Sequence, residues 1–309
     1  MKILIVGLGS IGKKHIAAII NVYPSAEIYA FRTNIKSETY DNVINIYSLK
    51  EIDFELDFIV ISNITASHEK TIIDMCKFKC PLFIEKPVLH SLENYERVAI
   101  ELEKNSIYTY VACNLRFHPS INFLKHYLKK NNVQVNEVNI YCGSYLPDWR
   151  PGEDFRKSYS SNKTLGGGVH LDLIHELDYC TWLFGFPFRS ESIKRNVSTL
   201  KIDSFDYAHF SFYYSNFIAN ITLNYFRRDR KRQIEIIAEN QTILVDLIDG
   251  VIIDNVSKKT LFKQQFDIFD TYKLQMQYFV DSILNKKTLM NDFNYSVKVL
   301  KLATYESTN

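Results

Sequence analysis

Strand-like and helix-like patterns of apolar residues alternate over the first third of the chain. The uninterrupted apolar run at 3–6 is typical of a strand buried on both faces, and the residues after it predict a helix over 13–22. Further strands are predicted at 27–31, 58–61 and 82–84, with helices that end near Phe78 and span 91–104. This alternation predicts a doubly wound parallel sheet covered by helices.

A second pattern begins after a strand predicted over 107–113. Pro119 opens another helix, and a helix led by three glycines is expected at 166–178. The remaining elements are a long strand around 138–145, a run of alternating strands from about 193 to 263, and helices near 272–284 and 295–305. We therefore predict an α/β protein with two domains, residues 1–117 and 118–309.

A glycine motif of the form G-x-G-x-x-G stands between the first strand and the first helix. Gly7 allows a tight turn, Gly9 lets the backbone approach a pyrophosphate, and Gly12 permits close packing of helix against strand. The backbone N–H groups of Ser10 and Ile11 open the helix and face the anion. The motif alone is weak evidence, but the strand before it and the helix after it predict a dinucleotide site.

The kind of dinucleotide is indicated by Arg32, at the end of the second predicted strand. NAD-binding proteins usually place an acid here to bind the adenosine ribose, and an acid would repel a 2′-phosphate that an arginine attracts. We therefore expect NADP in preference to NAD, with Thr33 and Asn34 as further donors. An arginine lying flat on the adenine is the alternative.

Polar residues follow the next two strands along the predicted sheet. Asn63, Thr65 and His68 come after the strand at 58–61, while Glu85 and Lys86 come after the strand at 82–84. Ligands of open parallel sheets lie beyond the carboxyl ends of the strands, so these residues are expected at the cofactor crevice. A lysine beside a bound nicotinamide can donate to a substrate oxygen; a solvated lysine is the alternative.

The helix led by three glycines carries Asp172, His175 and Asp178 at steps of three residues. Residues three apart share a helix face, so Asp172 can meet His175, and His175 can meet Asp178. A histidine held by a carboxylate is a competent general acid or base near neutral pH. A satisfied structural pair is the alternative.

Taken together, these motifs resemble the Gfo/Idh/MocA family of NAD(P)-dependent oxidoreductases, which includes glucose-fructose oxidoreductase and inositol dehydrogenase. The resemblance runs through nearly the whole chain. It rests on the glycine motif with His15, the segment 63–68, Glu85-Lys86-Pro87, Asn114-Leu115-Arg116-Phe117, the glycine-led helix and a late strand pair at 233–245. It implies a Rossmann domain followed by an α+β domain with a large open, mostly antiparallel sheet that often forms the subunit interface.

The resemblance also implies catalytic roles. The lysine of the Glu-Lys-Pro motif, here Lys86, commonly hydrogen-bonds the reacting hydroxyl, and the glycine-led helix supplies Asp172 and His175. The family more often spaces this pair as Asp-x-x-x-His, so the shorter spacing leaves open whether Asp172 or Asp178 orients His175. The implied reaction is hydride transfer between a nicotinamide and a hydroxyl or ketone of a sugar or sugar derivative.

The segment 145–159 lies between the long strand and the glycine-led helix and is placed to form a lid. Its aromatic residues can cover a sugar face and its arginines can bind a carboxylate or phosphate, although an ordinary solvent loop is the alternative. The residues predicted to contact substrate are Arg116, Trp149, Arg150, Arg156, Tyr159 and Asp178. The sequence of this segment resembles the corresponding segment of family members that build bacterial surface sugars, including nonulosonic acids and nucleotide-linked sugars.

Composition limits the other classes of function. A net charge of +2 gives no reason to expect nucleic acid, and a basic cluster at 227–232 is interpreted as a solvated strand end, with a role in binding an anion as the alternative. We expect no membrane span, signal peptide or metal site, and a cytoplasmic location; five cysteines without framework spacing agree with a reducing compartment. A homo-oligomer, dimer or tetramer, through the C-terminal sheet is expected.

Two functions other than sugar oxidation stay open. The chain can be a reductase of a non-sugar carbonyl or conjugated double bond, or a non-catalytic NADP-binding regulatory or scaffold protein on the same fold. The presence of Lys86, Asp172 and His175 favours polyol chemistry over both.

Overall fold

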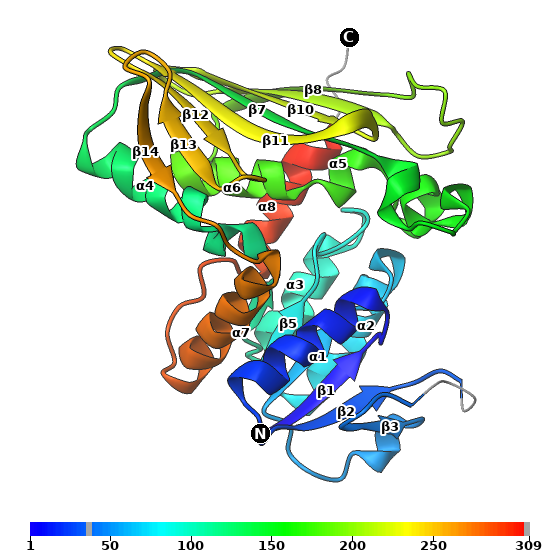
Figure 1. The fold of residues 1–309 in the computed structure, drawn as a ribbon. Coiled ribbons are helices and arrows are strands. Elements are labelled where there is room, and N and C mark those ends of the chain that lie inside the picture. Colours follow the sequence, from blue (N-terminus) through cyan, green and yellow to red (C-terminus); the bar gives the residue numbers. More distant parts are fainter. Residues whose placement is uncertain (35–38, 306–309) are drawn as a thin grey trace. The chain divides into compact units, whose positions relative to one another are not determined.

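The apolar runs of the first third form a six-stranded parallel sheet in the order β3-β2-β1-β4-β5-β6 (Figure 1). The computed structural model describes residues 1–34 and 39–305. The sheet strands are β1 (Lys2–Val6), β2 (Glu27–Phe31), β3 (Val43–Ile46), β4 (Phe58–Ile61), β5 (Leu82–Ile84) and β6 (Thr109–Val111). Every side chain of β4 and β5 is buried, as the two-sided burial of a parallel sheet requires.

The helices of this part begin near the predicted positions. They are α1 (Ser10–Val22), α2 (His68–Met75) and α3 (Tyr95–Lys104). The doubly wound sheet predicted from sequence is confirmed, but β3 was not predicted. This strand lies at the edge of the sheet, where only Ile46 is buried and Ile44 is 53% exposed. The polar Asn45 interrupts its apolar residues, so β3 lacks the apolar run of the central strands.

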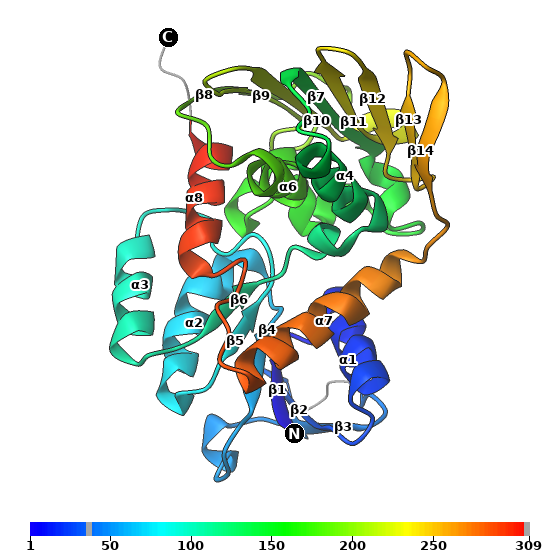
Figure 2. The same ribbon diagram turned by 90° about the vertical axis from the view of Figure 1, so that its left-hand side faces the viewer.

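A helix from late in the chain, α7 (Ile268–Leu284), belongs with this sheet. Phe279 of α7 is fully buried, and its ring lies 5.2 Å from that of Phe58 and 5.3 Å from that of Phe83. The helix also packs along α1 (Figure 2). Residues 1–114 and 268–298 therefore form one unit, and residues 115–267 with those from 299 onward form a second. The predicted division after residue 117 placed residues 268–298 in the second domain, whereas here they belong to the first unit.

The second unit is built on an eight-stranded sheet in the order β14-β13-β12-β11-β7-β10-β9-β8. All neighbouring strands are antiparallel except β7 and β10, so the mostly antiparallel sheet predicted from sequence is confirmed. The strands are β7 (Val135–Tyr145), β8 (Arg189–Arg195), β9 (Tyr207–Tyr213), β10 (Ile218–Asn224), β11 (Phe226–Ala238), β12 (Thr242–Asp246), β13 (Val251–Asp254) and β14 (Lys259–Lys263).

Helices cover one face of this sheet. They are α4 (Pro119–Lys130), α5 (Val169–Asp172) and α6 (His175–Phe184), and both views show α4 and α6 on the same side of the strands (Figures 1 and 2). In β9 and β10 every second residue is buried, which is the alternation of a sheet with one covered face. The last helix, α8 (Phe293–Thr304), runs from the first unit into the second. Within residues 1–34 and 39–305, no helix is long and apolar enough to cross a membrane.

His118 makes the stability of the second unit depend on pH. Its ring caps α4 by accepting from Ser120 N, lies 3.0 Å from the Leu247 carbonyl, and is 1% exposed. Burial is the main cause that lowers the pKa of His118 to about 4. The unfolded chain takes up this proton at a pKa of about 6.5, so the stabilising contribution is present above that pH and is lost as the pH falls toward 4.

We expect the free energy of unfolding to fall less steeply between pH 6.5 and 4 in His118→Asn, which keeps a capping side chain without a titrating ring. The difference over this range should reach about 2–3 kcal/mol. Urea unfolding at a series of pH values measures it. Parallel pH profiles for the two proteins would contradict the assignment.

Candidate active site

Two of the three motif glycines are required by the packing of the chain itself. Gly7 has φ of +99°, and a Cβ at this position would lie 2.3 Å from the backbone nitrogen of Asn63. A Cβ at Gly12 would lie 2.3 Å from the carbonyl oxygen of Gly7. The predicted roles of these two residues in the turn and in the close packing of α1 agree with this geometry.

Gly9 differs from the other two because its own chain leaves space around it. A Cβ built on Gly9 meets no atom within 4 Å, and its φ is that of an ordinary residue. Gly9 caps α1, which begins at Ser10, so the N–H groups of the first turn adjoin this open space. The missing side chain therefore fits the approach of a dinucleotide pyrophosphate to the backbone.

Arg32 lies just beyond β2, at the carboxyl end of the same sheet. Its backbone N–H donates to Ile46, and its side chain is partly buried. Within residues 1–34 and 39–305, the Nη1 atom of Arg32 is buried and has no hydrogen-bond partner. Thr33 and Asn34 follow it on the surface. A buried donor without an acceptor is costly, so this arginine is suited to an anionic group supplied by a ligand.

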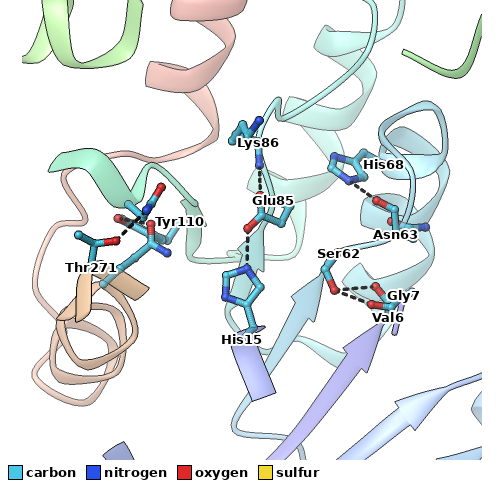
Figure 3. Close-up of polar contacts among 12 residues, drawn as sticks. Val6, Gly7, His15, Ser62, Asn63, His68, Glu85, Lys86, Tyr110 and Thr271 are labelled. Atoms are coloured by element: carbon cyan, nitrogen blue, oxygen red, sulfur yellow. Dashed lines mark hydrogen bonds and ion pairs between the residues drawn. The ribbon is translucent and has the colours of Figure 1, made fainter. Parts of the chain in front are cut away.

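Residues after β4 form a hydrogen-bonded wall next to the glycine turn (Figure 3). The Oγ atom of Ser62 donates to the Gly7 carbonyl at 2.7 Å, and the amide of Asn63 donates to Thr71 at 2.8 Å. Thr65 is buried. The ring of His68 is buried between the carbonyls of Asn63, Pro87 and Val88, and burial lowers its pKa. His68 therefore joins the segments after β4 and β5.

His15, Glu85 and Lys86 form a connected set in the same unit (Figure 3). The Nε2 atom of His15 lies 2.5 Å from Oε1 of Glu85, and Oε2 of Glu85 accepts the backbone N–H of Lys86 at 3.0 Å. His15 is fully buried. Burial acts to raise the pKa of Glu85, but the hydrogen bond and charge of His15, with the charge and N–H of Lys86, lower it overall. The pair thus ties α1 to the segment that carries Lys86.

The glycine-led helix is interrupted between its predicted functional residues. Asp172 ends α5, Leu173 leaves helical geometry at φ −101° and ψ 31°, and His175 begins α6. The expectation that Asp172 shares one continuous helix with His175 and Asp178 is therefore wrong, whereas His175 and Asp178 both lie on α6. The residue that the more frequent family spacing would add is absent, and the chain turns where the helix was predicted to continue.

Both aspartates have partners that the sequence did not indicate. Tyr225, the residue before β11, donates its hydroxyl to Oδ2 of Asp172 at 2.5 Å. The charge of Asp172 and burial raise the pKa of Tyr159, whose hydroxyl also bonds Asp172. Burial and Asp172 likewise raise the pKa of Tyr225. Both tyrosines therefore stay protonated, and each donates its hydroxyl to Asp172.

Asp178 forms a buried ion pair with Arg116. The guanidinium donates to both carboxylate oxygens, at 2.8 and 2.7 Å, and its side chain has no exposed surface. A second ion pair joins Glu176 of α6 to Arg232 of β11, with 2.6 Å between Nε and Oε1. Arg116 and Asp178 were predicted to contact the substrate, whereas in the structure each has the other as its partner.

The predicted lid consists of short 3₁₀ helices at Leu146–Trp149, Phe155–Lys157 and Tyr159–Ser161. The ring of Trp149 packs edge-on against Tyr225 at 5.4 Å, and its Nε1 donates to Ser144. Arg150 lies 3.9 Å from Glu153, and Arg156 lies 4.0 Å from Asp154. Asp172, Tyr159 and Tyr225 are here called the Asp172 cluster. The lid thus supplies one of its members, Tyr159, and Trp149 packs on the ring of another, Tyr225.

Family models match both units of this chain. Residues 1–112 match the model described as "Oxidoreductase family, NAD-binding Rossmann fold", and residues 134–244 match the GFO/IDH/MocA C-terminal domain. Inositol 2-dehydrogenase/D-chiro-inositol 3-dehydrogenase of Lacticaseibacillus casei is 24% identical over 204 residues, which are 62% of this chain and 56% of that protein. The chain spans about half the length of the curated relatives it matches.

Solved structures resemble this chain over more of its length than the curated relatives do. The WlbA dehydrogenase from Bordetella pertussis, in complex with NADH and UDP-GlcNAcA, has a TM-score of 0.83 at 16% identity and covers 98% of this chain and 93% of that one. UDP-N-acetylglucosamine 3-dehydrogenase GnnA from Acidithiobacillus ferrooxidans has a TM-score of 0.77 at 16% identity, covering 98% and 95%. This likeness shows a shared fold. Because the two family models together match more than half of its residues, the chain belongs to the Gfo/Idh/MocA family of oxidoreductases.

Proposed function

We propose that this chain is an NAD(P)-dependent oxidoreductase that transfers a hydride between a nicotinamide and a carbinol or carbonyl carbon of a sugar derivative. The observation that carries the proposal is the open space at Gly9, at the start of α1, in a turn whose other glycines are fixed by packing. When bound, the nicotinamide supplies the carbon that gives or accepts the hydride. The backbone of Gly9, Ser10 and Ile11 would hold the pyrophosphate.

The proton and the charge on the substrate oxygen are assigned to side chains. Lys86 donates to this oxygen and stabilises developing negative charge, while His175 accepts the hydroxyl proton in the oxidative direction. The side chain of Asp172 is held by the hydroxyls of Tyr225 and Tyr159. These bonds support a role for Asp172 in positioning the substrate or the imidazole ring of His175. The backbone N–H of Lys86 donates to the carboxylate of Glu85. This hydrogen bond holds the backbone from which the Lys86 side chain extends.

We propose a preference for NADP, which is supported by the buried Nη1 atom of Arg32, an atom without a hydrogen-bond partner among residues 1–34 and 39–305. Replacing Arg32 by aspartate should weaken NADPH binding by about ten- to a hundredfold, because charge-assisted bonds to the 2′-phosphate are exchanged for repulsion. NADH binding should not weaken. Fluorescence titration of both cofactors measures the ratio, with Arg97→Asp on the exposed face of α3 as the charge-matched control. The same cofactor preference in wild type and Arg32→Asp would refute this assignment.

The substrate class is inferred from the relatives. Several are named as inositol dehydrogenases, and structural neighbours are described with UDP-linked amino sugars or sugar acids. We propose a nucleotide-linked or nonulosonic sugar of surface-glycan biosynthesis as substrate, in the cytoplasm. The eight-stranded sheet is proposed as the surface through which copies of the chain assemble.

The test is an assay of the nicotinamide absorbance band with purified protein and a panel of sugars. The panel holds myo-inositol, glucose 6-phosphate and UDP-N-acetylglucosamine with NADP or NAD. A sugar-dependent change in this band is expected from at least one of them. Mass spectrometry of molecules that co-purify with the protein identifies a cofactor and substrate outside the panel. Cofactor binding without turnover of any sugar, including a co-purified one, would contradict the proposal.

A further inference from the structure

A buried polar contact joins α1 to the segment after β5. His15 of α1 is 0% exposed, and Glu85, the residue after β5, is 7% exposed (Figure 3). Two aromatic rings pack against the histidine, with centroid distances of 4.9 Å for Phe83 and 5.8 Å for Tyr272. Burying a histidine and a carboxylate among such groups costs free energy that two apolar residues would not cost. The contact therefore calls for an explanation other than packing.

The hydrogen bonds of this contact lead from His15 through Glu85 to Lys86. The Oε1 atom of Glu85 lies 2.5 Å from Nε2 of His15, and its Oε2 atom accepts the backbone N–H of Lys86 at 3.0 Å. The other ring nitrogen of His15, Nδ1, is buried and has no hydrogen-bond partner within residues 1–34 and 39–305. In this described part of the chain, the ring of His15 is thus bonded to Glu85.

His15 contributes to the charge state of Glu85. Burial is the largest influence on the pKa of Glu85 and acts to raise it. The hydrogen bond and charge of His15 come next and, together with Lys86, bring this pKa below its usual value. If the histidine is removed, the effect of burial is opposed by the charge and N–H of Lys86 alone. Glu85 should then take up a proton at a higher pH.

The other groups that face this contact do not replace His15. His68, at the start of α2, also interacts with the charge of Glu85, but burial lowers the pKa of His68. Its ring is therefore neutral near neutral pH and supplies no compensating charge. Tyr272 of α7 contacts the ring of His15. His15 thus remains the main group that stabilises the Glu85 carboxylate.

The charge of Glu85 matters for Lys86 because the two side chains interact. Their charges act on each other, and a carboxylate beside an ammonium favours the charged form of both. A protonated Glu85 can still accept a hydrogen bond, but it gives Lys86 no negative charge. Because Lys86 is assigned to stabilise negative charge on the substrate oxygen, loss of the carboxylate should weaken this function.

We propose that His15 is a positioning residue for Lys86. Its hydrogen bond keeps Glu85 ionised, and the ionised Glu85 holds the backbone of Lys86 and the charge on its side chain. The role is indirect, and it rests on the proposed function for the action of Lys86 on the substrate. A purely structural tie between α1 and the segment after β5 is the alternative.

The first test is labelling of Lys86 by acetic anhydride, read by mass spectrometry of the full-length protein, with the exposed Lys77 as internal reference. His15→Phe keeps a ring but removes the donor, so Glu85 should be protonated near pH 6. Lys86 should then be labelled about threefold faster than in wild type, because the neutral amine is the nucleophile. The ratio of variant to wild type should fall toward one at about pH 8, where Glu85 ionises. In Glu85→Gln the ratio should stay high at both pH values.

The second test is the pH dependence of turnover. The ratio of turnover in His15→Phe to that in wild type cancels the titration of His175, which both proteins share. This ratio should rise about fivefold between pH 5.5 and 7.5 as Glu85 ionises. His15→Gln, which keeps a donor for Glu85, should restore a flat ratio. His126→Phe, the same replacement at an exposed position of α4, is the matched control and should give a flat ratio close to one.

A loss of turnover in His15→Phe that is equal at every pH, with wild-type labelling of Lys86, would overturn the proposal in favour of the structural tie. If His15→Phe does not fold, Glu85→Gln decides the question, because wild-type labelling of Lys86 in that variant would also overturn it. The predicted labelling without dehydrogenase activity of wild type on any sugar would leave the role of His15 standing and reject the proposed function. Sugar turnover by wild type with flat ratios in His15→Phe would do the opposite.

Discussion

Replacing His175 by alanine is expected to lower turnover by about two to four powers of ten, the range for loss of a general acid or base. Lys86→Ala should cause a loss of similar size, because the substrate oxygen then lacks both a hydrogen bond and a compensating charge. Affinity for NADPH should remain close to wild type in both variants, since the glycine turn that is assigned to the cofactor is unchanged. Steady-state kinetics together with NADPH titration separates the two effects.

The controls are His126→Ala on α4 and Lys77→Ala after α2, which delete the same side chains from positions without an assigned role. Both controls should retain wild-type turnover. Undiminished turnover in His175→Ala and Lys86→Ala would end the catalytic assignment. Loss of NADPH binding in either variant would reassign that residue to the cofactor.

Asp178→Ala is expected to lower the free energy of unfolding by about 3–5 kcal/mol, because it leaves the Arg116 charge buried without its partner. The side chain of Arg116 is fully buried and both of the bonds given above go to Asp178. Urea denaturation measures the loss. This is the largest stability effect predicted for the second unit.

A matched double replacement distinguishes this structural role from substrate contact. Arg116→Met/Asp178→Leu removes both charges and keeps apolar volume, so it should recover most of the stability lost in Asp178→Ala. If Asp178 serves mainly as a substrate contact, the single variant will instead unfold like wild type and show a raised KM.

The first sheet could be predicted because its strands are continuous apolar runs. The bounds of β2, β4 and β5 are those predicted. In β4 and β5 every side chain is apolar and buried, so the apolar run and the strand have the same ends. β3 lacked this signal because it is a short edge strand with an exposed Ile44. α7 packs in the first unit because Phe279 contacts Phe58 and Phe83. These residues are about 200 positions away in the sequence, so a local hydrophobic pattern could not predict the contact.

The candidate site was predictable where one local motif carries it. The glycine turn and Lys86 follow from a strand, a turn and a helix in sequence. The partners of Asp172 and Asp178 could not be predicted in this way, because Tyr225 and Arg116 belong to segments more than 50 residues away in the sequence. The spacing of Asp172, His175 and Asp178 correctly predicted local helix but gave no sign of the break at Leu173, because the three-residue step fits a continuous helix equally well.

The proposal that Lys86 and His175 act on the same substrate oxygen is tested by a double-variant cycle on turnover. If they do, Lys86→Ala/His175→Ala should lose little more turnover than the worse single variant, because residues that act as one unit have strongly non-additive effects. A double variant whose loss equals the product of the two single losses would show independent roles and would contradict the account.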